Sequence, residues 1–96
     1  MLESKIQSKI LKTLKELGIY AYKNITTNRK GIPDIICCID GKFVALEVKQ
    51  AKGKTTDLQD YNIKMIRESG GVAEVVRSVA DTLEVIKKIQ KDKYAN

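Results

Sequence analysis

The chain has 96 residues, 43% of them hydrophobic, and a formal net charge of +6. This size and composition fit one small domain spanning residues 1–96. No apolar run approaches the roughly 20 residues that cross a bilayer, and the N-terminal segment lacks the pattern of a signal peptide. We therefore expect a cytoplasmic protein with no membrane partner. The absence of histidine excludes mechanisms that need a histidine base and the usual Cys/His zinc site.

Residues 2–17 have the periodicity of an amphipathic helix that ends at Gly18. Its apolar stripe consists of Ile6, Ile10, Leu14 and Leu17. Glu3 falls inside this stripe, where a carboxylate is costly unless another group compensates it. An inward-facing Glu3 is therefore a first indication of a polar site.

Residues 19–25 have strand character, and residues 26–31 form a polar loop. A hairpin is predicted next, with strands over 34–39 and 42–49, because Asp40-Gly41 favours a tight turn. The first strand is continuously apolar, which is typical of a strand covered on both faces. We expect both of its cysteines, Cys37 and Cys38, to be small core residues without a disulfide.

A basic loop over residues 50–55 precedes a second helix, which is predicted to run from a Thr56–Gln59 capping box to about Ser69. Gly70-Gly71 ends this helix. The residues expected on its inward side are Leu58, Tyr61, Met65 and Ile66.

A short strand is predicted over residues 72–76, followed by a helix capped by Ser78. Its expected inward residues are Val79, Leu83, Ile86 and Ile89, and the tail from Lys87 onward is expected to fray. The resulting order is an αβββαβ core with a C-terminal helix. Since the last strand must join through a helical crossover, we predict an α/β fold with a mixed central sheet flanked by helices.

The register of the hairpin brings charged residues together. The turn places Ile39 opposite Lys42, and counting outward places Asp34 opposite Glu47. Directly opposed residues share a face of the sheet, with Cβ atoms roughly 4.5–5.5 Å apart. Lys49 lies two residues beyond Glu47 and therefore shares that face.

Two opposed carboxylates destabilise a sheet unless a cation lies between them. Mg²⁺ prefers oxygen ligands and commonly binds through one or two carboxylates. Asp34 and Glu47 can supply these, the Val48 carbonyl can be a third ligand, and Glu3 can be a fourth. Lys49 can orient or deprotonate a water and offset charge on a phosphate, while the metal activates both. The alternative is structural: Asp34 ends a turn, and Glu47 and Lys49 form a solvated pair.

At these residues the chain resembles a known family. Pro33-Asp34 with Glu47-Val48-Lys49 is similar to the motif of the PD-(D/E)XK nuclease superfamily, whose core is restriction-endonuclease-like. Within it, the chain resembles the VRR-NUC (viral replication and repair nuclease) domain over about residues 3–86. The further matching segments are Glu3-Ser4-Lys5-Ile6-Gln7, Gly31-Ile32, Gly53 to Gln59, Gly70-Gly71 and Val76-Arg77-Ser78.

The resemblance implies cleavage of DNA with Mg²⁺ or Mn²⁺ and no small-molecule cofactor. It implies that Asp34, Glu47, the Val48 carbonyl and Glu3 hold the metal and that Lys49 is the catalytic lysine. It also implies a homodimer that acts on branched DNA such as four-way (Holliday) junctions, in the cytoplasm of a bacterium or a phage-infected host.

DNA contacts are expected from the two loops beside the predicted site. The candidates are Arg29, Lys30, Lys52, Lys54 and Gln59. Gln59 matches a glutamine of the family and also serves the capping box. Affinity that comes from lysines and arginines on phosphates falls steeply with salt.

Two other functional classes remain open. The same fold can be a non-catalytic nucleic-acid-binding module, whose binding would be indifferent to chelator and to substitution of Asp34, Glu47 or Lys49. It can also be an assembly subunit whose basic face contacts a protein, in which case DNA binding would be absent even at low salt.

Overall fold

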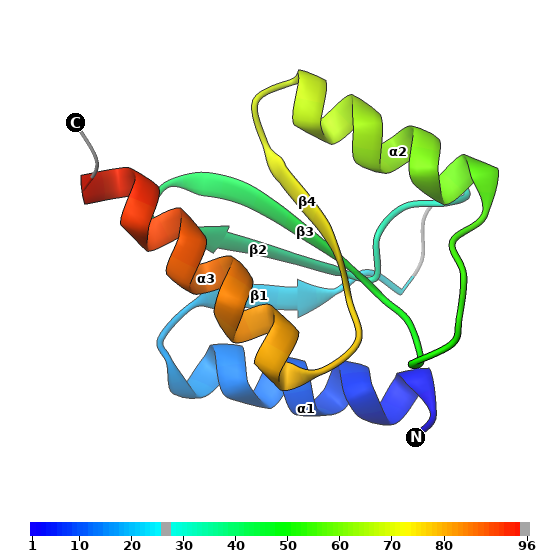
Figure 1. Ribbon diagram of the computed structural model, residues 1–96, viewed down its shortest axis with the longest axis horizontal. Coiled ribbons are helices and arrows are strands. Elements are labelled where there is room, and N and C mark those ends of the chain that lie inside the picture. The colour runs from blue at the N-terminus through cyan, green and yellow to red at the C-terminus, as the bar shows by residue number, and fades with distance from the viewer. Residues whose placement is uncertain (26–27, 95–96) are drawn as a thin grey trace.

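The computed structural model describes residues 1–25 and 28–94. Its elements are α1 (Glu3–Glu16), β1 (Tyr20–Lys23), β2 (Ile35–Ile39), β3 (Lys42–Val48), α2 (Asp57–Glu68), β4 (Val72–Val76) and α3 (Val79–Tyr94) (Figure 1). The predicted order is confirmed. The first two residues of the expected loop 26–31 lie outside the described residues. In the part that is described, no helix is long and apolar enough to cross a membrane.

The four strands form one mixed sheet in the order β1-β2-β3-β4. Neighbours are antiparallel except β3 and β4, which pair in parallel through the α2 crossover, as expected for a parallel connection. The hairpin turn has positive φ at both Asp40 and Gly41, the geometry that suits a two-residue connection. Ile39 therefore pairs with Lys42, as predicted.

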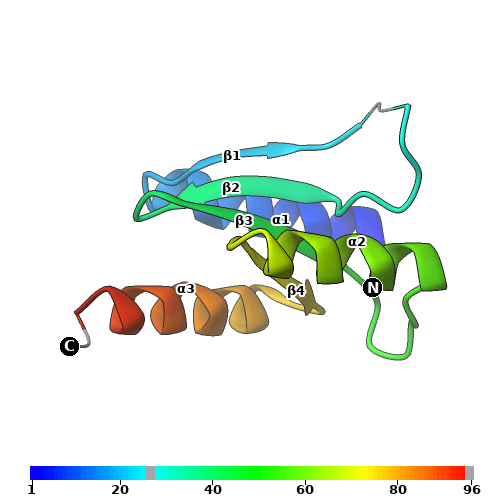
Figure 2. The ribbon, with the colours of Figure 1, turned by 90° about the horizontal axis from the view of Figure 1, so that it is seen from above.

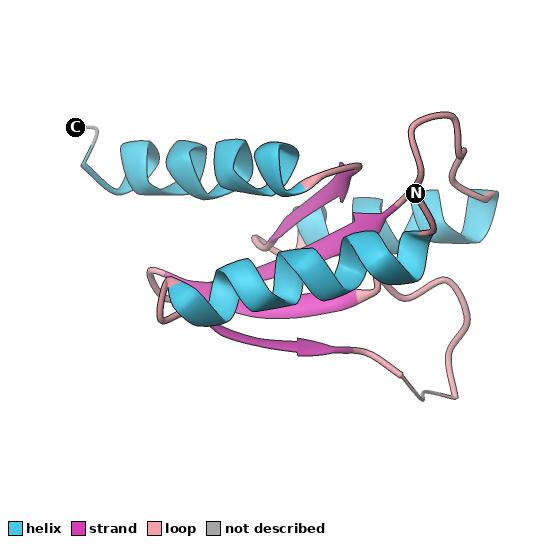
Figure 3. Cartoon of the chain, turned by 90° about the horizontal axis from the view of Figure 1, so that it is seen from below, coloured by secondary structure: helices cyan, strands magenta, loops and turns pink. Residues whose placement is uncertain are grey.

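The main core lies between the sheet and two helices, α1 and α3, which cover the same face (Figure 3). Ile10 and Leu14 of α1 are completely buried in this core, together with Val44 and Val48 of β3. On the opposite face, α2 packs on β3 and β4, with Ile63 against Ala45 and Ala73. The uncovered part of that face lies over β1 and β2.

Because helices cover both faces of the sheet only at β3 and β4, some predictions of which residues are buried are wrong. In β2 only alternate residues, Ile35, Cys37 and Ile39, are buried, and Cys38 is exposed. The continuous apolar run of β2 therefore does not mean that both of its faces are buried. Helix α2 packs on β3 and β4 and does not fully cover β2. Leu17 is also exposed, since α1 ends before it.

The inward side of α2 differs from the predicted one. Leu58, Tyr61 and Met65 are exposed, whereas Asn62 and Ile63 are buried. The burial of Asn62 is compensated by two hydrogen bonds, which its Nδ2 atom donates to the carbonyls of Lys30 and Leu58. The helix is thus rotated, relative to the prediction, so that Asn62 faces inward. The spacing of apolar residues could not predict this rotation, because the inward residue is polar.

The last helix departs from the prediction at two points. Thr82 is buried in place of Leu83, and the Thr82 hydroxyl bonds to the Ser78 carbonyl. The helix does not fray from Lys87 but continues to Tyr94, because Ile89 is buried against the core.

The loops before β2 and after β3 project at the same end of the molecule, on either side of the N-terminal end of α2 (Figure 2). The N-terminus of α1 lies at this end as well. Side chains at the open end of the β2–β3 hairpin therefore have two loops, the start of α2 and the start of α1 near them.

Candidate active site

Asp34 and Glu47 converge at the open end of the hairpin. The last paired residues are Ile35 and Leu46, and one further step outward places Asp34 opposite Glu47, as predicted. The two carboxylates lie close enough together that Asp34 contributes to a raised pKa of Glu47. The backbone on the other side of Asp34 is anchored to the preceding segment, because its carbonyl accepts a 2.8 Å hydrogen bond from the Asn24 N–H.

Glu47 is a buried carboxylate with limited compensation. Its side chain is 2% exposed, and its Oε2 atom accepts a 3.3 Å hydrogen bond from Gln59 Nε2. Among the described residues, its Oε1 atom has no hydrogen-bond partner. Burial first, and then Asp34, raise the pKa of Glu47 to about 8, with a smaller increase from Glu3 and an opposing effect of Lys49. Such a carboxylate is stabilised by an added positive charge.

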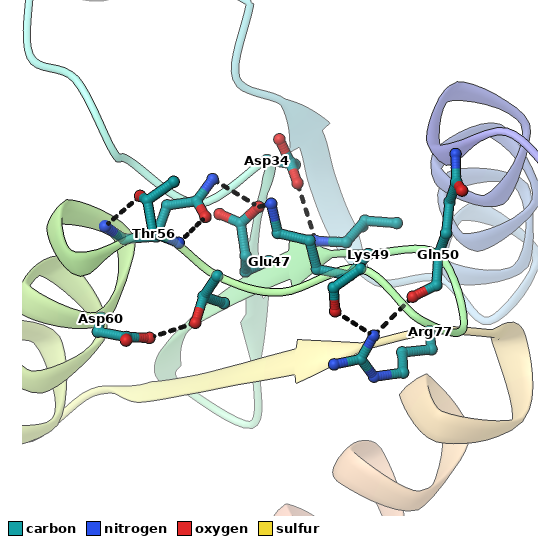
Figure 4. A network of polar contacts seen from close by, with 11 residues as sticks. Asp34, Glu47, Lys49, Gln50, Thr56, Asp60 and Arg77 are labelled. Carbon is teal, nitrogen blue, oxygen red and sulfur yellow. Dashed lines mark hydrogen bonds and ion pairs between the residues drawn. The ribbon is translucent and has the colours of Figure 1, made fainter.

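Lys49 supplies a cation at the same place. Its side chain is 11% exposed, and its Nζ atom lies 3.9 Å from Glu47 Oε2 (Figure 4). Its backbone N–H donates to the Val76 carbonyl, which fixes the chain to β4 just after β3 ends. The predicted trio of Asp34, Glu47 and Lys49 is therefore brought together.

Pro33 explains how the Val48 backbone becomes available. The hairpin register would place Pro33 opposite Val48, but proline has no N–H to give to the Val48 carbonyl. The Val48 N–H, in turn, donates to Asp34 Oδ2 at 2.8 Å. The pairing of β2 with β3 therefore ends in a contact between the Asp34 carboxylate and the Val48 N–H. The Val48 carbonyl receives no hydrogen bond from Pro33, because proline has no N–H.

Glu3 lies near Asp34 and Glu47, but the three carboxylates do not form one cluster in the described structure. The charge of Glu3 contributes to the raised pKa of Glu47, and a Cβ atom on Gly53 would lie 3.6 Å from Glu3 Oε2. Within the described residues, no group of three or more cysteine or carboxylate side chains is placed to hold one metal ion. The structure thus supports a pair of carboxylates, with Glu3 at its margin.

The basic loops are exposed on both sides of the pair. The side chains of Arg29, Lys30, Lys52 and Lys54 are all accessible. The loop before β2 is held closely, because Gly31 has a φ of 78° and a Cβ atom there would lie 2.7 Å from Leu58 Cγ. The loop is thereby pressed against α2.

Arg77 holds the other loop, a role that sequence reasoning missed. Its Nη1 atom donates to three backbone carbonyls, those of Gln50, Ala51 and Gly53. Figure 4 shows the contact with Gln50. A single arginine after a strand has no distinguishing pattern, so only its place in the matched segment Val76-Arg77-Ser78 drew attention to it.

Gln7 is a second residue whose burial was not predicted. It lies one helical turn beyond Glu3 on α1 and is 8% exposed. In the part of the chain that is described, its Oε1 atom has no hydrogen-bond partner. The only signal in the sequence was its position at the edge of the apolar stripe.

The donor set fits a hard divalent cation. Two carboxylates converge, and one buried oxygen of Glu47 has no hydrogen-bond donor in the part of the chain that the structure describes. Mg²⁺ commonly binds through one or two carboxylates and keeps several waters, so a pair is sufficient. The Val48 carbonyl is a further hard oxygen at the same strand end.

Comparison with known proteins places these features in a family. The sequence profile of the VRR-NUC domain matches residues 1–80. A solved structure titled "VRR_NUC domain protein" is 20% identical and superposes with a TM-score of 0.75 over 95% of this chain and 87% of that one. A second, titled "VRR_NUC domain", is 23% identical, with a TM-score of 0.73 over 96% of this chain and 97% of that one. No protein with a curated description matches.

Proposed function

The chain belongs to the VRR-NUC domain family, a nuclease-type domain, and we propose that it is a metal-dependent, structure-selective DNA endonuclease. The observation that carries the proposal is the buried Glu47, which lies beside the Asp34 carboxylate and has one oxygen without a hydrogen-bond donor among the described residues. A structural ion pair would satisfy that oxygen. A site built for Mg²⁺ or Mn²⁺ leaves it available.

The residues of the site have separable tasks. Asp34, Glu47 and the Val48 carbonyl would hold the cation, with Glu3 close enough to act on it electrostatically. A bound Mg²⁺ or Mn²⁺ would supply Lewis-acid activation of water and of the phosphoryl group. Lys49 places its ammonium beside Glu47, where it would orient the attacking water and offset negative charge that develops on the phosphate.

The exposed basic loops support DNA as the substrate. Arg29 and Lys30 lie on one loop, and Lys52 and Lys54 lie on the other, at the same end of the molecule (Figure 2). They would contact phosphates without reading bases. Selectivity would then rest on DNA shape, which suits branched substrates such as four-way junctions.

A homodimer would place two such sites on a two-fold junction. The uncovered face of the sheet offers a surface for a second copy of the chain. Cross-strand register places Tyr20, Cys38 and Phe43 in one row of that face, and both aromatic residues are at least half exposed. A groove of about 450 Å³ beside α2 continues this apolar surface. Light scattering of wild type and Phe43→Ser tests the dimer, which should dissociate in the variant.

The function is tested by cleavage of a panel of labelled duplex, flap and four-way-junction DNA with Mg²⁺ or Mn²⁺. Lys49→Ala should lose at least about 100-fold in rate, the scale of positioned proton transfer, and EDTA should abolish cleavage. Lys88→Ala, an exposed lysine on α3, is the matched control and should keep wild-type activity. Activity that survives in Lys49→Ala would overturn the assignment, and metal-independent DNA binding without cleavage would favour a binding module.

A further inference from the structure

Gln59 joins the beginning of α2 to the candidate site. It occupies the N3 position of a complete capping box, in which Gln59 N donates to Thr56 Oγ1 and Thr56 N donates to Gln59 Oε1 at 2.9 Å. The same side chain donates from Nε2 to Glu47 Oε2 at 3.3 Å. Both ends of one amide are therefore used, one by the helix and one by the site.

The planarity of the amide makes these two contacts dependent on each other. When the Thr56 N–H holds Oε1, the amide plane can turn only a little, so the direction in which Nε2 points is largely fixed. A helix cap formed by a glutamate at the same position would satisfy Thr56 equally well. It would, however, present an oxygen rather than a donor to Glu47.

The contact also selects between the two oxygens of Glu47. Gln59 occupies Oε2, together with Lys49 at 3.9 Å, while Oε1 has no donor among the described residues. The Glu47 carboxylate is thus held in one orientation, with a defined oxygen free. Neighbours that orient metal-binding side chains in this way commonly affect metal affinity.

We propose that Gln59 is a positioning residue, which the capping box of α2 aims at Glu47 so that this carboxylate is pre-oriented for a divalent cation. The inference rests on the proposed function, and it gives Gln59 a role other than contact with DNA. It assigns to the beginning of α2 a task beyond helix stability.

The test separates the cap from the donor by two substitutions. Gln59→Met keeps the length and helix preference of the side chain but removes the amide. Thr56→Ala removes the hydroxyl of the cap but keeps the backbone N–H that holds Gln59 Oε1. Binding of Mn²⁺ is measured by calorimetry well below the melting temperature of both variants, with circular dichroism to confirm that each is folded.

We expect Gln59→Met to raise the Kd for Mn²⁺ about tenfold and Thr56→Ala to change it less than about twofold. Cleavage by Gln59→Met should recover at high Mn²⁺, whereas Lys49→Ala should not. In metal-free protein, the side-chain amide signals of Gln59 in a ¹H–¹⁵N spectrum should shift when Glu47 is replaced by Ala.

The outcomes distinguish this inference from the function on which it rests. Wild-type protein that binds Mn²⁺ and cleaves DNA, with Gln59→Met equal to it, would overturn the positioning role alone. Equal weakening of Mn²⁺ binding by both variants would also overturn it, because the cap would then act only through helix stability. A wild-type protein that binds no Mn²⁺ would overturn both proposals.

Discussion

The Asp34 carboxylate accepts a 2.8 Å hydrogen bond from the Val48 backbone N–H. This side chain thus gives the Val48 N–H an acceptor just beyond the last paired residues of the hairpin, and it also faces Glu47. The position of Asp34 therefore depends on the backbone of the neighbouring strand. This dual role leads to predictions in which stability and metal binding change in opposite directions.

Asp34→Asn should preserve the fold and lose the metal. The amide oxygen of asparagine can still accept from the Val48 N–H, while the negative charge beside Glu47 disappears. We expect the melting temperature of metal-free protein at pH 8 to equal or exceed that of wild type. Calorimetry should show affinity for Mn²⁺ reduced by at least about tenfold. A melting temperature far below that of wild type, and equal to that of Asp34→Ala, would show that the asparagine does not replace the contact.

Glu47 should make the metal-free protein less stable as the pH rises. Its pKa is raised to about 8 in the fold, above the usual value of about 4.3 in an unfolded chain. The fold therefore favours the protonated form, and its stabilising contribution is complete below the unfolded pKa. That contribution decreases through the window between the two values and is lost above about pH 8.

Urea denaturation of metal-free protein between pH 4.5 and 9 measures this effect, which should amount to a few kcal/mol. Glu47→Gln should flatten the profile across the same window. Mn²⁺ binding should release protons below pH 8, because the cation requires the ionised carboxylate. An unchanged profile in Glu47→Gln would contradict the assignment of the effect to this residue.

Gly31→Ala should destabilise the protein more than Gly41→Ala. Both glycines have positive φ, so each substitution carries the same kind of backbone strain. Only at Gly31 would the new Cβ atom collide, at 2.7 Å from Leu58 Cγ, whereas Gly41 has open space. Urea denaturation should give about 1–2 kcal/mol for Gly41→Ala and more for Gly31→Ala. Equal losses would mean that Leu58 moves aside without cost.

Arg77→Ala should loosen the loop over residues 50–53. The three carbonyls that Arg77 holds would lose their shared donor, and we expect faster hydrogen exchange at the Gly53 N–H, which bonds to Gln50. Stability should fall by about 1 kcal/mol, since hydrogen bonds exposed to solvent contribute modestly. Arg77→Lys retains the charge without the planar fork and should behave like Arg77→Ala. Wild-type exchange in Arg77→Lys would assign the effect to charge alone.

The two cysteines should differ in reactivity although they are adjacent. Cys38 is exposed and Cys37 is buried, and burial, with a smaller effect of Cys38, raises the pKa of the Cys37 thiol to about 11. Because the thiolate is the reactive form, native protein should react with one equivalent of a thiol reagent, and denatured protein with two. Cys38→Ser should abolish the native reaction. Persistent reaction in that variant would indicate that the sheet opens readily at β2.

The sequence by itself determined the elements and the register of the hairpin. Asp40-Gly41 requires a two-residue turn with positive φ, and the strict alternation of a strand then places Asp34 and Glu47 on one face. Local capping signals at Gly18, Thr56 and Ser78 also act within a few residues. These features depend on short-range geometry, so they can be predicted without knowledge of the fold.

Only the tertiary structure decided which faces are covered and which polar groups meet. The rotation of α2 depends on Asn62 and its bond to the Lys30 carbonyl, a contact across 32 positions of the chain. The approach of Gln59 to Glu47 and of Arg77 to the loop after β3 depends on the α2 crossover. Such contacts follow from the packing of whole elements, because burial makes a polar group seek whichever partner the fold brings near it.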